Sequence, residues 1–257
     1  MRAHSTQDWD AVARRFETRV CHVLGEDRRG VVAAAVARER RRLRGRSETV
    51  AADVGCGIGR ALPLLAGSFD RVIAVDGSRA CLERARSRTR RSGAIKFVLA
   101  DLARERLALP PVDVVLCINV ALTPVERDRR RILENAVRNL RRGGRLLLVL
   151  PALESDLLVR RRLAGWNRVR LREKRGERVA DGIVEAGGVL TKHWTREELL
   201  LAAAGLGCRC VSIDRVEYDW GTELVRPPRS FREPYPWDWL AVLEVTAPRS
   251  PARSASR

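Results

Sequence analysis

A glycine-rich turn directly after an apolar segment is the feature of this sequence best suited to chemistry. Residues 49–54 form an apolar run that predicts a buried strand, and this run leads straight into Gly55, Gly57 and Gly59. Glycine adopts positive φ angles readily and lets a ligand lie against the backbone. A helix after the turn would present free N–H groups to a carboxylate or phosphate. The turn therefore predicts a ligand-binding site at the end of this strand.

The glycine spacing and two later carboxylates narrow the kind of ligand. A dinucleotide fingerprint reads G-x-G-x-x-G, whereas this turn reads G-x-G-x-G. Asp76 ends the next predicted strand, where a carboxylate can accept hydrogen bonds from both hydroxyls of a ribose. Asp101 ends the strand after that, within reach of an adenine amino group. Because open α/β sheets bind ligands at the carboxyl ends of their strands, we expect these groups at one edge.

Alternating strands and helices are expected to position these residues. This alternation predicts parallel pairing through right-handed crossovers. Strands are predicted at 49–54, 71–76, 95–100, 112–118 and 145–150, and helices at 9–24, 30–43, 60–67, 78–91 and 123–143. Ser78 is expected to cap one helix, and a capping box at Thr123 to begin another that Gly143 ends.

Beyond Pro151 the pattern becomes irregular, which predicts an insertion before the sheet is completed. Residues 152–177 read as a basic helix, and 179–193 as an extended pair with turns at 181–182 and 187–188. A second capping box at Thr195 begins a helix that Gly205 ends, and two last strands follow at 208–220 and 239–245. The expected organisation is N-terminal helices at 1–46, a cofactor-binding core at 47–151, a basic insertion at 152–194, the last helix and strands at 195–246, and a disordered tail at 247–257.

With these residues in this order, the chain resembles the class I S-adenosylmethionine-dependent methyltransferases. The resemblance covers residues 50–150 closely and the last two strands more loosely. It implies an α/β, Rossmann-like fold, with a mostly parallel seven-stranded sheet in the order 3-2-1-4-5-7-6 and helices on both faces. It also implies S-adenosylmethionine as the cofactor. The positions expected to bind it are Asp53, Gly55, Cys56, Gly57, Gly59, Asp76, Gly77, Asp101, Leu102 and Asn119.

The resemblance gives several of these positions separate roles. The glycine turn matches the segment under the amino-acid end of the cofactor, and Asp53 matches a residue that helps to hold its ammonium group. Asp76 matches the ribose ligand, and Asp101 with Leu102 matches the adenine contacts. Asn119 falls where the family lines the passage from the cofactor sulfur to the acceptor. A nicotinamide-dependent oxidoreductase is the rival within this fold class, but the glycine spacing and the lack of a Tyr-x-x-x-Lys pair speak against it.

Residues on the acceptor side must come from outside the common core. Methyl transfer from a sulfonium needs alignment above all, and a base only where the acceptor is protonated. We take His193 as the candidate base and Tyr218 as the candidate hydrogen-bond donor, although a histidine beside Trp194 also fits a packed structural residue. The aromatic stripe of Trp9 and Phe16 fits either a lid over the cofactor or a helix that faces the core.

The charge of the chain is weak evidence for a nucleic-acid partner. The formal net charge is +18, but only three of the 50 basic residues are lysines, a ratio typical of arginine-rich codon usage. The Asn/Asp-Pro-Pro-aromatic motif of amino-directed nucleic-acid enzymes is missing, as is the Pro-Cys of cytosine-C5 enzymes. A small-molecule acceptor is therefore the first hypothesis. The basic insertion keeps RNA or protein methylation as an alternative, and a cofactor-binding protein without turnover is the third.

Cysteine usage and hydropathy bear on metals and membranes. None of the six cysteines has zinc-like spacing with a histidine, so no metal site is expected. No apolar run approaches the roughly 20 residues that a membrane helix needs. Residues 1–10 lack the apolar core of a signal peptide. The chain is therefore expected in the cytoplasm, without a membrane partner.

Overall fold

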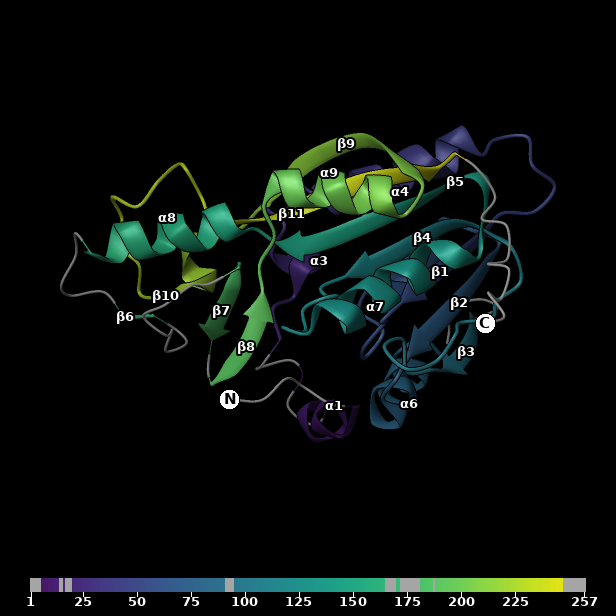
Figure 1. The fold of residues 1–257 in the computed structure, drawn as a ribbon, viewed down its shortest axis with the longest axis horizontal. Coiled ribbons are helices and arrows are strands. Elements are labelled where there is room, and N and C mark those ends of the chain that lie inside the picture. The colour runs from purple at the N-terminus through teal and green to yellow at the C-terminus, as the bar shows by residue number, and fades with distance from the viewer. Residues whose placement is uncertain are drawn as a thin grey trace, which may run out of the picture.

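The centre of the protein is a seven-stranded sheet in the order β3-β2-β1-β4-β5-β11-β9 (Figure 1). The computed structural model describes residues 6–13, 16, 20–90, 95–164, 170–171, 181–186 and 188–246. Neighbouring strands from β3 to β5 pair in parallel, and β11 is antiparallel to β5 and β9. Because β9 and β11 are the sixth and seventh strands of this sheet along the chain, the predicted order 3-2-1-4-5-7-6 is confirmed.

The bounds of the described elements follow the predicted alternation through the first five strands. The sheet consists of β1 (Val50–Val54), β2 (Arg71–Asp76), β3 (Ile95–Leu99), β4 (Val112–Ile118), β5 (Leu140–Pro151), β9 (Cys208–Glu217) and β11 (Trp237–Val245). The helices are α1 (Thr6–Ala13), α3 (Val23–Glu26), α4 (Val31–Arg42), α5 (Leu62–Ala66), α6 (Arg79–Arg88), α7 (Glu126–Arg138), α8 (Leu153–Ala164), α9 (Arg196–Gly205) and the 3-10 turn η1 (Trp220–Thr222). Four short strands lie outside the main sheet: β6 (Arg170–Leu171), β7 (Ile183–Ala186), β8 (Val189–Lys192) and β10 (Leu224–Val225).

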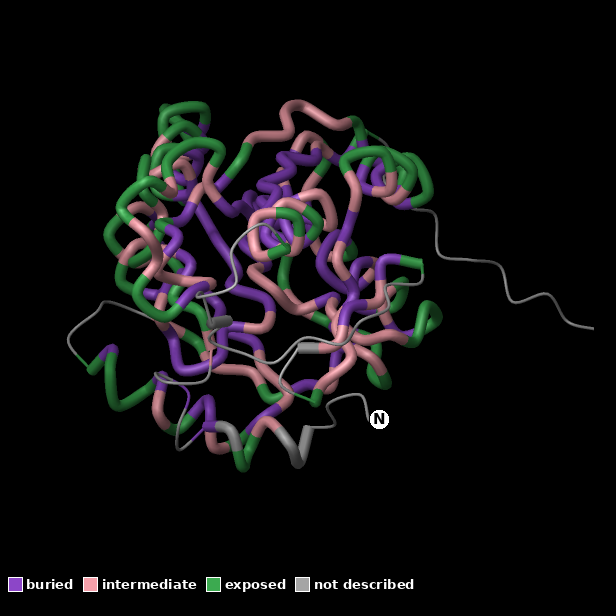
Figure 2. Tube along the Cα trace, turned by 90° about the vertical axis from the view of Figure 1, so that its left-hand side faces the viewer, coloured by how far each residue is buried: buried purple, intermediate pink, exposed green. Residues whose placement is uncertain are grey.

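Helices cover both faces of the sheet because successive strand residues point to opposite sides. Ala51 and Leu116 pack with α4, α5 and α6 on one face, while Ala52 and Val115 pack with α7 and α9 on the other. Figure 2 shows the buried strands in the interior with exposed helix surfaces around them. Burial on both faces explains why β1 and β4 read as nearly continuous apolar runs.

A smaller core forms beside the main sheet, from two segments that are distant in sequence. Val159 of α8 packs with Trp220 of η1 and Leu224 of β10. The Trp220 and Phe231 rings meet edge to face, with 5.1 Å between their centroids. The insertion after β5 thus packs against the connection between β9 and β11, on the left in Figure 1.

The predicted continuous helix at 9–24 is wrong. The first helix ends at Ala13, and α3 begins at Val23. One nitrogen of the Arg60 side chain donates to the carbonyls of Val20, at 2.9 Å, and Cys21, at 3.1 Å. These carbonyls are therefore satisfied by a side chain instead of by a helical backbone partner.

The two predicted capping boxes have opposite outcomes. The box at Thr195 is confirmed: its hydroxyl accepts from Glu198 N at 3.1 Å, and Glu198 Oε2 accepts from Thr195 N at 2.8 Å. The box at Thr123 is wrong, because α7 begins only at Glu126 and the Thr123 hydroxyl accepts from Val125 N. The preceding Leu122 carbonyl accepts a hydrogen bond from the Lys192 amide at the end of β8. This bond joins the segment to the β7–β8 pair and not to a helix.

Other boundaries shift for local reasons. Ser78 caps α6 as predicted, with its hydroxyl accepting from Cys81 N. The next helix ends at Arg138, not at Gly143, because the Asn139 side chain is hydrogen-bonded to the backbone before β4. Residues 170–171 form β6, paired with β10, and are not helical. Of the predicted basic helix at 152–177, residues 153–164 form α8, whereas 165–169 and 172–177 lie outside the described residues, as do 178–180 and the tail at 247–257. None of the described helices is long and apolar enough to cross a membrane.

The contrast between the two threonines gives a stability prediction. Replacing Thr195 by alanine should lower the free energy of unfolding by about 1 kcal/mol, because the N-terminus of α9 loses its side-chain acceptor. Replacing Thr123 by alanine is the matched control and should cost less than about 0.5 kcal/mol, since no helix begins there. Urea unfolding followed by circular dichroism measures both. Equal losses would contradict the assignment of the cap.

Candidate functional site

The glycine turn lies at the carboxyl end of β1, and its glycines have φ angles that side chains disfavour. Gly55, Gly57 and Gly59 have φ values of 79°, 53° and 79°. A Cβ atom on Gly55 would lie 2.2 Å from Val120 Cγ2, and one on Gly57 would lie 2.8 Å from Phe16 Cζ. The amides of Gly55 and Cys56 both donate to the Val75 carbonyl, which fixes the turn to the end of β2. The result is a bare backbone surface held in one position.

Asp76, at the end of β2, points into this turn. Its Oδ2 accepts from Gly57 N at 2.8 Å, and its Oδ1 accepts from Ser78 N at 2.8 Å. Burial raises the pKa of Asp76, although these two hydrogen bonds oppose the rise. Each carboxylate oxygen keeps a lone pair, so the side chain can accept further hydrogen bonds, for example from two neighbouring hydroxyls.

Asp53 of β1 is a buried carboxylate with an unused oxygen. Asp53 is only 3% exposed. Its Oδ2 is buried and has no hydrogen-bond partner among the described residues. Burial, and secondly the charge of Asp76, raise the pKa of Asp53 to about 7. An unpaired buried polar atom costs free energy, which a cationic donor in this position would recover. The site therefore fits an ammonium group.

The third predicted strand end extends the same edge of the sheet. Asp101 Oδ1 accepts from Ala103 N at 2.9 Å, and the Asp101 amide donates to Glu105 Oε1 at 3.1 Å. Leu102 is buried in the core, and its carbonyl accepts from Asn135 Nδ2 at 2.8 Å. These contacts hold the segment after β3 in one conformation. Its assignment to adenine stays a prediction.

Two more predicted cofactor positions are Cys56, within the glycine turn, and Gly77, directly after Asp76. Cys56 is buried, and burial keeps the pKa of its thiol well above the ordinary value, so the thiol is neutral. Gly77 follows Asp76 directly and is partly buried at the start of the connection to α6. Neither residue supplies a charge, and both contribute backbone to the lining.

A second group of polar side chains gathers on one carboxylate that the sequence analysis missed. Asp238 Oδ2 accepts from Tyr218 Oη at 2.8 Å and from Asn119 Nδ2 at 3.2 Å. Asn119 has a φ of 53°, and its Oδ1 is buried without a hydrogen-bond partner. The structure thus brings together two residues that were predicted separately. The signal for Asp238 is its position between Trp237 and Trp239, where an acid stands among apolar residues at the start of the strand.

His193 lies on the same edge but in a different group. Its amide donates to the Gly182 carbonyl at 2.8 Å, and the neighbouring amides of Lys192 and Trp194 donate to Leu122 and Pro151. These bonds place the end of β8 beside the loop after β4 and the end of β5. The backbone bond of His193 runs to Gly182 and the hydroxyl bond of Tyr218 to Asp238, so the two candidate catalytic residues share no described hydrogen-bond partner.

The N-terminal segment rests on the glycine turn. Phe16 lies against Gly57, and its ring is 6.4 Å from that of Trp9, centroid to centroid. Asp10 Oδ1 accepts from Ala80 N at 3.2 Å and from the Ser78 hydroxyl, which joins α1 to the start of α6. The aromatic stripe therefore packs on the turn itself, the position that a lid over a ligand would occupy.

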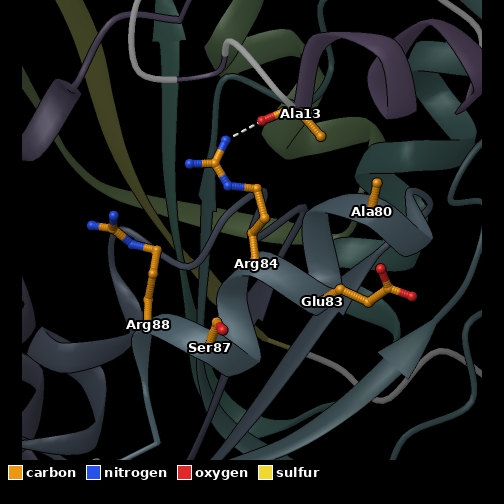
Figure 3. Close-up of a pocket in the computed structure, with 6 residues that line it drawn as sticks. All are labelled: Ala13, Ala80, Glu83, Arg84, Ser87 and Arg88. Carbon is orange, nitrogen blue, oxygen red and sulfur yellow. Dashed lines mark hydrogen bonds between the residues drawn. The ribbon is translucent and has the colours of Figure 1, made fainter.

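A groove between α1 and α6 is distinct from this site. Figure 3 shows its lining, in which the Arg84 side chain donates to the Ala13 carbonyl. Its volume is about 610 Å³, and it is lined by Ala13, Ala80, Glu83, Arg84, Ser87 and Arg88. None of these residues belongs to the glycine turn or to a strand end. We therefore place the chemistry at the sheet edge and not in this groove.

Comparison with known proteins identifies the domain that carries this edge. Residues 51–144 match the methyltransferase domain family, a span that contains the glycine turn, Asp76, Asp101 and Asn119. No curated protein matches the sequence.

Solved structures match over nearly the whole chain. The N-methyltransferase NodS from Bradyrhizobium japonicum, in complex with S-adenosylhomocysteine, is 15% identical with a TM-score of 0.61, covering 93% of this chain and 98% of NodS. CalS10 from Micromonospora echinaspora, an amino pentose methyltransferase, is 19% identical with a TM-score of 0.56, covering 92% of this chain and 97% of CalS10. A Haloferax volcanii methyltransferase in complex with the Trm112 activator is 15% identical with a TM-score of 0.59, at 93% and 98% coverage. Identities this low show a shared fold.

Proposed function

We propose that this chain, a class I S-adenosylmethionine-dependent methyltransferase, transfers the methyl group to a small-molecule acceptor. The observation that carries the proposal is the arrangement under the glycine turn. There an unpaired buried oxygen of Asp53 and the carboxylate of Asp76 border a glycine turn in which a side chain at Gly55 or Gly57 would collide with Val120 or Phe16.

The residues at this edge fit the cofactor in a definite order. Asp53 would hold the ammonium group, Asp76 the ribose hydroxyls, and Asp101 with Leu102 the adenine. Gly55, Cys56, Gly57, Gly59 and Gly77 would supply backbone along the molecule, and Asn119 would line the path from sulfur to acceptor. The bound cofactor supplies an electrophilic methyl group on a sulfonium. What remains for the protein is to align the acceptor with that methyl group and to exclude water.

The surroundings of Tyr218 favour a small molecule over RNA. Its hydroxyl contacts Asp238, and besides burial the charges that raise its pKa are those of Asp238, Cys21 and Asp27. A polyanion would be repelled by such a group and would need a basic contact there. CalS10, whose fold matches along the whole chain, is described as an amino pentose methyltransferase, which supports an acceptor of that size.

Calorimetry and label transfer test the function in two steps. Titration with S-adenosylmethionine and S-adenosylhomocysteine should show binding of both at one site. Incubation with cofactor labelled on the methyl group should then label members of a metabolite mixture and leave RNA and protein unlabelled. No affinity for either compound would refute the proposed cofactor. Label appearing only in RNA or protein would refute the proposed acceptor class.

His193 is tested separately as the base. Replacing His193 by alanine should lower kcat about 100-fold if it removes a proton from the acceptor, while cofactor affinity stays within about twofold. Thr191→Ala, two residues earlier in β8, is the control and should leave both values unchanged. Steady-state kinetics with the labelled acceptor measures kcat. Unchanged turnover would assign His193 to packing only.

A further inference from the structure

We propose that the acceptor is an amine and that Asp238 receives its nitrogen. The inference rests on the proposed function, because it assigns the acceptor half of the same site. It starts from the position of Asp238, the second residue of β11. That strand is antiparallel to β5, and Asp238 pairs with Pro151, the last residue of β5. Asp238 therefore lies at the carboxyl edge of the parallel strands. There it contacts Asn119, the residue directly after β4.

In the described part of the chain, the hydrogen bonds around Asp238 leave two acceptor oxygens, Asp238 Oδ1 and Asn119 Oδ1, and one N–H of Asn119 unused. Asp238 is 9% exposed, and both of its described donors, Tyr218 and Asn119, contact the same oxygen, Oδ2. Its Oδ1 accepts no hydrogen bond among the described residues. Asn119 Oδ1 is also buried without a partner. A ligand that completes this group must supply N–H or O–H donors, and an ammonium group supplies three while a hydroxyl supplies one.

Tyr218 cannot supply the negative charge that would bind an ammonium group. Burial and the charge of Asp238 raise the pKa of its phenol well above the ordinary value. The phenol is therefore a neutral donor, already directed at Asp238. The carboxylate is the one group of the trio that can carry a negative charge toward a ligand.

Carboxylates outnumber cations among the leading charges that act on Cys21 and Tyr218, although the chain as a whole is strongly basic. The thiol of Cys21 lies near the carboxylates of Asp238, Glu223 and Glu26 and near the guanidinium of Arg60. Tyr218 feels Asp27 in addition to Asp238. Four carboxylates thus act on one small region: Glu26 of α3, Asp27 directly after it, Glu223 after η1 and Asp238 of β11. In a chain with a formal net charge of +18, such a region attracts a cation locally.

Cys21 connects this region with the cofactor side. Its side chain is exposed to solvent, yet burial is the main cause that raises the pKa of its thiol to about 12. Five residues earlier, Phe16 lies on the glycine turn. The same N-terminal segment therefore borders both the glycine turn and the surroundings of Asp238.

With an amine bound at Asp238, this carboxylate and not His193 takes the proton, and the reaction balances. A bound ammonium group passes one proton to the Asp238 carboxylate, which leaves a lone pair on nitrogen. That nitrogen then forms a bond to the methyl carbon as the carbon–sulfur bond breaks, and the bonding electron pair stays on sulfur as a thioether. The products are the methylated ammonium ion, S-adenosylhomocysteine and a proton, which leaves Asp238 for solvent.

Two matched probes test this assignment without knowledge of the natural acceptor. In both, nitrogen replaces the sulfur of S-adenosylmethionine and carries an arm toward the acceptor side. One arm is 2-aminoethyl and the other 2-hydroxyethyl. Calorimetry with the full chain at about pH 7.5 should show the amino probe binding at least about tenfold more tightly, because its ammonium group meets a buried carboxylate.

Three variants separate charge from shape. In Asp238→Asn the preference for the amino arm should fall below about twofold, because the anion is gone. In Tyr218→Phe the carboxylate remains, so the preference should persist. Asp214→Asn on the neighbouring β9, a carboxylate that accepts from the Ser212 hydroxyl, is the control and should behave like the wild type. Thermal melting and the affinity for S-adenosylhomocysteine establish that each variant is folded.

The outcomes are distinguishable. Equal affinity for the two arms, a preference that survives in Asp238→Asn, or binding of S-adenosylhomocysteine with rejection of both arms would each overturn the amine assignment and leave the proposed function intact. Failure of S-adenosylhomocysteine itself to bind the wild type would instead overturn the proposed function. Should Asp238→Asn not fold, Glu223→Gln replaces it, with a smaller but measurable loss of the preference expected.

Discussion

Replacing Asp76 by asparagine should weaken S-adenosylmethionine binding about 100-fold or more, even though the two side chains have the same shape. Both carboxylate oxygens already accept from backbone amides, those of Gly57 and Ser78. An asparagine can accept at only one of these positions, and its amide nitrogen would face an N–H group at the other. The ribose hydroxyls would also lose charge-assisted hydrogen bonds worth about 1.5–3 kcal/mol each. The substitution therefore disturbs the glycine turn and removes the ligand for the sugar together.

Asp70, directly before β2, supplies the control, because Asp76 ends that strand. Asp70 accepts from the amide and the hydroxyl of Thr49, at the edge of the sheet opposite the glycine turn. Asp70→Asn should leave the cofactor affinity within about twofold, although it removes a comparable set of hydrogen bonds. Calorimetry at one pH compares both variants with the wild type. Similar losses in the two variants would mean that Asp76 acts through general stability and not through the ribose.

The strands and strand-end residues were predictable from the sequence where the local residue pattern and the overall fold agree. The strand before Gly55 is buried on both faces, so its composition alone indicates its place in a parallel sheet. Once that strand and the next two are placed, the strand-end positions of Asp53, Asp76 and Asp101 follow, because all parallel strands end at one edge. The residues themselves were thus predictable, whereas their roles toward the cofactor stay predictions.

The failures occur where a distant contact decides the local structure. Thr123 has the residues of a capping box, yet the Leu122 carbonyl is bound by an amide from β8, seventy residues later in the chain. Residues 9–24 have helical spacing, yet Arg60 binds the carbonyls of Val20 and Cys21. Asp238 was missed for the same reason. Its donors, Asn119 and Tyr218, come from other parts of the chain, and only the antiparallel register of β11 brings the three together.

Asp53 and Asp76 form a pair of like charges beneath the glycine turn, and this makes the empty protein sensitive to pH. Burial and Asp76 raise the pKa of Asp53 in the folded chain to about 7, from 3.8. Between these two pH values the unfolded chain has lost the proton that the folded chain keeps. The folded state is therefore favoured at low pH and loses that advantage as pH rises from about 4 to 7, by up to about 4 kcal/mol. Asp53→Asn should remove this loss and stabilise the empty protein above pH 7.

Cofactor binding should depend on pH in the opposite direction. The ammonium group favours the ionised form of Asp53, so affinity for S-adenosylmethionine should rise with pH and level off above about pH 7. Below the pKa, each pH unit should cost roughly tenfold, and binding should release a proton. Calorimetry from about pH 5.5 to 7.5, in two buffers with different ionisation enthalpies, measures the affinity and the released proton together.

Asp53→Asn separates this effect from other titrations at the site. The variant should bind the cofactor about 100-fold more weakly near pH 7.5, because a buried ammonium group loses its counter-charge. Its affinity should also depend much less on pH, and the remaining slope belongs to Asp76, whose pKa burial also raises. A variant that keeps the full slope would show that another group titrates. A variant that is more stable when empty yet binds the cofactor less tightly is the combination expected of a carboxylate that the fold keeps buried for a cationic ligand.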